Sequence, residues 1–180
     1  AGSGNYLRGD NAWTAVPAGL SWTNSSAVTC DGNQNVIFDS IPATATIIVM
    51  HFVGVSTASS STMYFRVGTS AAWLETGDKY DYASGAIWHN GTSSTDQNDN
   101  KIRLFRADSA ASSIRNGLIT FFKCNDDYWT WSHTGGHEGN GTGYSASSGT
   151  VEVGAALTRM VLMSNSGNFD AGSAYLSYLS

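Results

Sequence analysis

Two stretches of the chain combine aromatic rings with polar side chains, which is the mixture that a sugar-binding surface needs. They span residues 73–90 and 125–133. A sugar presents apolar C–H faces and hydroxyl groups, so a flat ring beside Asp, Asn or His can satisfy both. The first stretch is the better candidate for binding a receptor or glycan. Its candidate residues are Trp73, Tyr80, Asp81, Tyr82, Trp88, His89 and Asn90.

Each aromatic candidate also has a structural explanation. Trp73 and Trp88 could simply fill the core, and this alternative is favoured, whereas the nearby tyrosines are flanked by Asp and Lys and are expected to be exposed. In the second stretch, alternation places Trp129 and Trp131 on one side of a strand. That spacing favours two core tryptophans.

Carboxylates suited to glycoside cleavage are not obvious in the sequence. Retaining glycosidases need two carboxyls about 5 Å apart, and inverting glycosidases need a wider spacing. Asp126 and Asp127 are neighbours in an expected hairpin turn and do not provide this, which leaves Glu75 and Asp81 as the pair an enzyme would use. The chain also lacks a Gly-x-Ser-x-Gly elbow, a P-loop and a Cys-x-x-Cys motif. We therefore predict a protein that is not an enzyme.

Metal-binding patterns are weak. His133 and His137 lack the helical His-Glu-x-x-His arrangement. The Gly-rich segment between them could still surround a metal ion, or bring these residues next to those of other copies on a trimer axis. Residues 96–100 imitate the start of a calcium loop, but Lys101 replaces the required Gly and Ala107 stands where the bidentate Glu belongs. We expect no metal and no other cofactor.

Composition bounds the class of protein. The 180 residues suit one domain, and charged residues make up 13% of them, roughly half the usual share. Few charges with abundant Ser, Thr, Asn and Gly indicate a β-protein with many turns. The formal charge of −5 and the absence of a Lys/Arg cluster argue against nucleic acid, and no stretch is apolar enough for membrane insertion. Cys30 and Cys124 are expected to be free thiols, as is usual for a protein assembled in a reducing cytoplasm.

Short apolar stretches separated by Gly, Asn, Asp and Ser clusters predict an all-β fold, an antiparallel β-sandwich that is jelly-roll-like. We expect an N-terminal arm over residues 1–19 and the sandwich over 20–180. Residues 46–50 are apolar on both faces, which indicates a central strand or one covered by a neighbouring subunit. One or two helical turns could form over 108–116. Loops are expected at 56–62, 90–100 and 134–149. The predicted strands are 35–39, 44–53, 63–67, 101–106, 118–123, 128–132, 151–153, 159–163 and 174–179.

Three phrases mark the beginning, middle and end of the chain. They are YLRGDNAW at 6–13, VIFDSIPATATIIVMHFVGVST at 36–57 and FDAGSAYLSY at 169–178. In this order they resemble a family of C-terminal β-domains from tailed-bacteriophage tail fibres and related virion appendages. Shorter similarities at 65–68, 74–80, 117–120 and 157–162 extend the resemblance over nearly the whole chain. Residues 80–100 depart from the family pattern, so receptor specificity does not carry over.

The resemblance implies a homotrimer on the virion surface, in contact with other virion proteins and with a bacterial surface glycan or protein. It supplies no catalytic residues. Its implied role is non-catalytic attachment at the distal end of a tail fibre. The alternatives are a purely structural capsid decoration or head-fibre protein, and a glycan-cleaving tailspike-type enzyme. The arm residues expected to take part in oligomerisation are Tyr6, Leu7, Arg8, Asp10 and Trp13.

Overall fold

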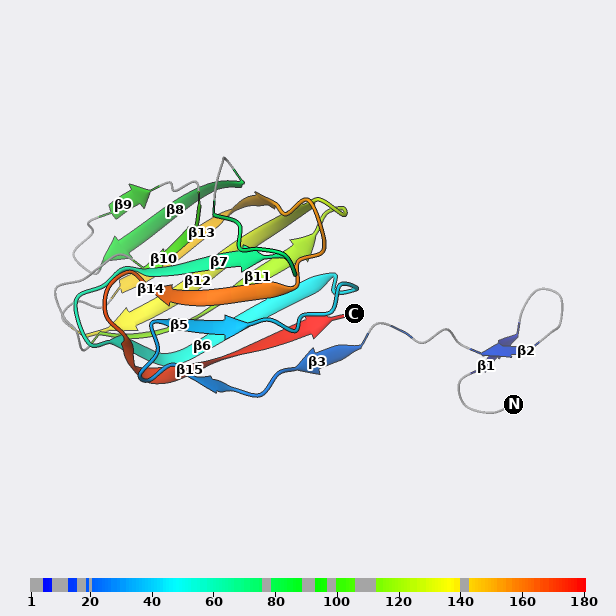
Figure 1. The fold of residues 1–180 in the computed structure, drawn as a ribbon, viewed down its shortest axis with the longest axis horizontal. Coiled ribbons are helices and arrows are strands. Elements are labelled where there is room, and N and C mark those ends of the chain that lie inside the picture. Colours follow the sequence, from blue (N-terminus) through cyan, green and yellow to red (C-terminus); the bar gives the residue numbers. More distant parts are fainter. Residues whose placement is uncertain are drawn as a thin grey trace.

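The protein is an all-β sandwich of two antiparallel sheets packed face to face, which confirms the predicted fold class (Figure 1). The computed structural model describes residues 5–7, 13–15, 19, 21–75, 79–88, 93–96, 100–105, 113–139 and 143–180, with the side chains of 5–7, 13–15, 81–88 and 93–96 left undescribed. No helix occurs in this part of the chain.

The smaller sheet has four strands and lies in front of the larger one in Figure 1. Its side chains alternate between a buried inner face and an outer face, as the period of two along a strand requires. In spatial order its strands are β10 (Ile102–Phe105), β7 (Met63–Gly68), β14 (Arg159–Ser164) and β5 (Asn35–Phe38).

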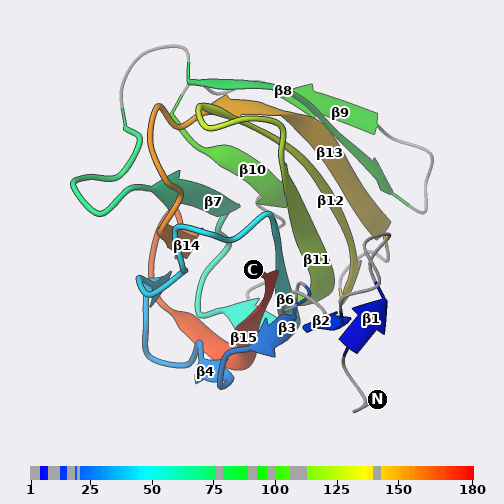
Figure 2. The same cartoon turned by 90° about the vertical axis from the view of Figure 1, so that its right-hand side faces the viewer.

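The larger sheet has nine strands and curves around the inner face of the smaller one (Figure 2). The strand that contains residues 47–50 of the run that is apolar on both faces is central in this sheet and paired on both sides, as one of the two sequence interpretations predicted. In order the strands are β3 (Trp22–Asn24), β15 (Phe169–Leu179), β6 (Ile47–Thr57), β11 (Ile114–Lys123), β12 (Tyr128–Glu138), β13 (Gly143–Glu152), β8 (Tyr80–Trp88) and β9 (Ser93–Asp96), and β4 (Val28–Thr29) also pairs with β15.

The N-terminal phrase forms a hairpin of its own. Strands β1 (Asn5–Leu7) and β2 (Trp13–Ala15) pair only with each other, with Tyr6 opposite Thr14 and Leu7 opposite Trp13. The expected roles of Arg8 and Asp10 lie outside the described residues.

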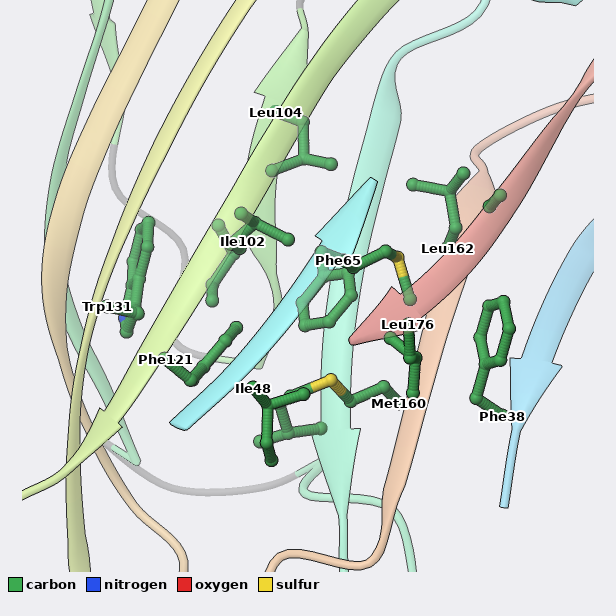
Figure 3. Packing of buried hydrophobic residues seen from close by; sticks show 14 of the residues in the cluster. Phe38, Ile48, Phe65, Ile102, Leu104, Phe121, Trp131, Met160, Leu162 and Leu176 are labelled. Atoms are coloured by element: carbon green, nitrogen blue, oxygen red, sulfur yellow. The ribbon is translucent and has the colours of Figure 1, made fainter. Parts of the chain in front are cut away.

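The core fills the space between the two sheets, where alternate residues of each sheet point inward (Figure 3). Phe65 from the small sheet meets Phe121 from the large sheet, with ring centroids 5.5 Å apart. Trp129 and Trp131 are both buried, so the interpretation of this pair as core residues is confirmed. Of the two cysteines, Cys30 is buried, Cys124 is exposed and both are free; burial raises the pKa of the Cys30 thiol to about 11.

A backbone interlock joins β6 to β15 at the point where the register of their pairing shifts. Gly54 has φ 66° and Gly172 has φ 92°, both in the left-handed region that side chains disfavour. A Cβ atom on Gly172 would lie 2.5 Å from the Cα of Val55, so the two backbones touch directly. Beside them the Ser56 hydroxyl donates a hydrogen bond to the Asp170 carboxylate. The interlock therefore uses the Gly and polar residues of two phrases that carry the phage-fibre resemblance.

Three sequence predictions of secondary structure were wrong. Residues 90–100 were expected to be a loop, but Ser93–Asp96 form β9, which pairs with β8. Residues 134–149 were expected to be a loop, but most of them belong to the paired strands β12 and β13. Their inner face there carries His137, Gly135, Ser145 and Ser147 in place of apolar residues, so the hydrophobic alternation that marks a strand is missing. The helical turn expected over 108–116 is wrong at its described end, because residues 114–116 begin β11.

Candidate functional site

The predicted aromatic stretch divides between core and surface. Tyr80 is only 4% exposed, and its hydroxyl accepts a hydrogen bond from the Val67 N–H at 3.0 Å, so the expectation that it is exposed was wrong. Burial raises its pKa well above the ordinary value. The backbone of Asp81, Tyr82 and Trp88 lies in β8, but their side chains are not described, and His89 and Asn90 lie outside the described residues. These five stay predictions.

Trp73 lies half-buried on the outer face of the small sheet, because a tight turn folds the chain back along β7. The Thr69 N–H donates to the Ala72 carbonyl at 2.9 Å, and Trp73 then pairs with Gly68. A Cβ atom on Gly68 would lie 2.9 Å from Cε3 of the indole, so the ring occupies space that a side chain there would fill. The Arg159 guanidinium of β14 lies over this ring, 4.4 Å from its centroid.

A shallow hollow of about 140 Å³ opens beside Trp73. Its lining combines apolar side chains with an amide, a guanidinium and a carboxylate. The residues that line this Trp73 hollow are Asn35, Ile37, Arg66, Trp73, Glu75, Val161 and Met163. An indole ring, apolar side chains and polar groups together match the mixed surface of a sugar.

Positive charge gathers around the Trp73 hollow. Arg66 donates from one guanidinium nitrogen to Glu75 at 2.7 Å and from Nε to the Asn100 carbonyl at 3.1 Å. The Lys101 ammonium lies 4.1 Å from the centroid of the Tyr64 ring. Burial, followed by repulsion from Arg66, lowers the Lys101 pKa below its usual value. Two cations on this face therefore contact aromatic rings by cation–π interactions.

Sequence reasoning identified Trp73 but not the cations around it. Arg66, Lys101 and Arg159 come from three different strand regions, and only the pairing of β10, β7 and β14 brings them together. The one local signal was the proximity of Arg66 and Glu75 in sequence, nine positions apart.

The two metal-candidate histidines do not come together. His133 and His137 lie four residues apart on one strand, which at about 3.3 Å per residue separates them by roughly 13 Å. His133 is buried between the rings of Phe52 and Phe105, with centroids 6.1 and 5.3 Å away. Among the residues the structure describes, no group of three His, Cys, Asp or Glu side chains could hold a metal ion.

His133 makes stability depend on pH. Burial lowers its pKa from 6.5 to about 3, so between these values the unfolded chain binds a proton that the folded chain does not. This contribution to stability is complete above about pH 6.5 and is lost as the pH falls. When the pH falls from 7 to 5, we expect the titration of His133 to lower the free energy of unfolding by about 2 kcal/mol.

Urea unfolding of wild type and His133→Phe at both pH values measures this effect. Phenylalanine is close in shape and cannot titrate, so the variant should lose about 2 kcal/mol less than wild type over the interval. Equal losses in the two proteins would contradict the assignment of the pH dependence to His133.

The carboxylates considered for catalysis do not form a described pair. Glu75 is engaged with Arg66, and the Asp81 side chain is not described. Asp126 and Asp127 occupy the exposed turn between β11 and β12, where the Asn125 side chain accepts the Asp127 N–H at 2.9 Å. A hydrogen bond from Lys123 lowers the Asp126 pKa. This arrangement is a solvated hairpin tip.

Comparison of the sequence with protein-family models gives no match, and comparison with curated proteins gives none either. Within the described residues there is no helix with the length and hydropathy needed to cross a membrane.

Proposed function

We propose that the chain is a non-catalytic attachment module of a bacteriophage virion, located at the distal end of a tail fibre, which binds a bacterial surface glycan. The observation that carries the proposal is the ordered set of fibre-like phrases over the chain. Two of them supply neighbouring strands, since residues 47–57 form β6 and residues 169–178 fall in β15. Their glycines and the Ser56–Asp170 hydrogen bond meet at one interlock, which gives a shared structural reason for both phrases.

The Trp73 hollow supports the binding part of the proposal. It combines an aromatic ring with polar groups at the surface of the sandwich and has a volume of about 140 Å³. A small hollow on a rigid sheet binds weakly by itself. Several copies in one fibre would raise the avidity for a repeating polysaccharide.

The outer face of the large sheet supports association into a homotrimer. Its central strands β6 and β11 expose apolar side chains, among them Val53, Leu118 and Phe122 at 54%, 36% and 46%. The outward positions of these two strands carry no charged residue from Ile47 to Val53 or from Ile114 to Phe122. Because identical charged faces would repel, an uncharged apolar face suits contact between copies of the same chain.

Binding of the purified protein to host cells and to a bacterial glycan array tests the proposal. We expect saturable binding that is lost in Trp73→Ala or Trp88→Ala while thermal unfolding and oligomeric mass, measured by light scattering, are retained. Tight association with phage capsids and no binding to any host surface would instead favour a decoration protein. Release of shorter saccharides from a bound glycan would favour a tailspike-type enzyme.

A further inference from the structure

We propose that the Trp73 hollow selects an acidic sugar, one that carries a carboxylate or a phosphate group. This inference rests on the proposed attachment to a glycan and specifies the chemistry of the sugar that is recognised.

The shape of the hollow suits one sugar ring. Its volume of about 140 Å³ is close to that of a cavity, about 150 Å³, that accommodates a benzene molecule. Ile37 lines the hollow with 46% of its surface exposed, although it is apolar; it belongs to β5, an edge strand that pairs with β14. Apolar side chains beside the Trp73 ring can receive the C–H face of a sugar, while Asn35, which also lines the hollow, can bond to its hydroxyls.

The charge around the hollow selects the kind of sugar. In a chain with a formal charge of −5, this face gathers four of the nine cationic side chains, Arg66, Lys101, Arg103 and Arg159. Among the described carboxylates, Glu75 lies on this face and Asp39 lies just beyond the end of β5. The cations therefore outnumber these carboxylates.

Two of these cations, Lys101 and Arg159, lie beside the hollow and not in its lining. Glu75 already occupies Arg66, whereas Lys101 and Arg159 contact the rings of Tyr64 and Trp73. No carboxylate in the described part of the chain lies within ion-pair distance of either cation. A guanidinium that lies over an indole ring still has N–H groups that can donate two parallel hydrogen bonds to a carboxylate or phosphate.

The test is direct titration of the purified 180-residue chain with two pairs of oligosaccharides. One pair is a uronic-acid oligosaccharide and its carboxyl-reduced form; the other is a phosphate-bearing oligosaccharide and its dephosphorylated form. We expect at least one acidic member to bind about tenfold more tightly than its neutral partner, and the preference to weaken as salt is added. If the uronic-acid pair shows the tighter binding, the recognised group is a carboxylate; if the phosphate pair shows it, the recognised group is a phosphate.

Matched charge variants locate the effect. Arg159→Gln and Lys101→Gln should each weaken acidic-sugar binding about tenfold, whereas Lys123→Gln removes the same charge from the hairpin tip of the other sheet and should leave it unchanged. Thermal unfolding of each variant checks that the fold is retained. Equal affinity for acidic and neutral partners, or an equal loss in Lys123→Gln, would overturn the inference.

Whole-cell binding by the same proteins separates this inference from the proposed function. If the protein binds cells but shows no preference for acidic over neutral sugars, the proposed attachment is supported and the acidic-sugar inference is overturned. Acidic-sugar binding by a protein that binds no cells would support the site and overturn attachment. If the protein binds neither cells nor acidic sugars, the proposed attachment and the acidic-sugar site are both overturned.

Discussion

Gly172→Ala is expected to destabilise the sandwich by about 4 kcal/mol, because two penalties act at the same atom. The residue has φ 92°, where a side chain meets its own backbone, and a new Cβ atom would lie 2.5 and 2.6 Å from backbone atoms of Val55 and Gly54. Backbone atoms of a central strand cannot move aside as a flexible side chain can. Urea unfolding at a fixed protein concentration measures the loss.

Gly154→Ala is the matched control for this variant. Gly154 has φ 67°, but nothing lies within 4 Å of a Cβ atom built there. It therefore carries the conformational penalty alone, about 1 kcal/mol. A Gly172→Ala loss no larger than that of Gly154→Ala would show that the interlock between β6 and β15 tolerates a side chain.

Trp131→Ala is expected to reduce the unfolding free energy by about 4 kcal/mol. The indole is 2% exposed and lies beside Phe121 with ring centroids 6.4 Å apart, in the layer between the two sheets. Removing it leaves a cavity lined by side chains that β-strands hold in place, so the surroundings can relax only partly. Chemical denaturation followed by far-UV circular dichroism, which does not depend on the lost fluorophore, measures the change.

Trp22→Ala gives the comparison for that experiment. Trp22 is also a strand residue, but 54% of its surface is exposed, so its truncation should change stability by less than about 0.5 kcal/mol. Similar losses in the two variants would contradict the assignment of Trp131 to the core.

The parts of the fold that the sequence predicted are those with apolar alternation or apolar runs. Ile102 and Leu104 face inward while Arg103 faces outward, and β10 was predicted from that pattern. The pattern fails in the outer half of β12 and β13, where Gly135 and Ser145 point inward. A Cβ atom on Gly135 would lie 2.5 Å from the Phe105 ring. The residue at position 135 must therefore be small, because the Phe105 side chain fills the space beside it. The apolar alternation along one strand cannot predict this kind of size complementarity between residues of two different sheets.

The candidate site was predictable only in part for a similar reason. An aromatic residue beside polar ones was visible in the sequence, but the expected environments were reversed. Trp73 was expected to fill the core and lies half-buried on the outer face, whereas Tyr80 was expected to be exposed and is buried. Their positions relative to β7 decide which of them is buried. Tyr80 contacts Val67 on the inner side of β7, whereas Trp73 lies over Gly68 on the outer side. That distinction depends on which strands pair, and sequence spacing does not encode it.

The position of β15 has a consequence for how the chain folds during synthesis. This last strand lies between β6 and the first strands of the sandwich, with Tyr175 opposite His51 and Tyr178 opposite Thr23. Both partners leave the ribosome long before β15 does, and their edges stay unpaired until it arrives. Pairings so distant in sequence form slowly. We therefore expect the domain to complete its fold only after β15 has left the ribosome, which makes the nascent chain dependent on chaperones that shield unpaired strand edges.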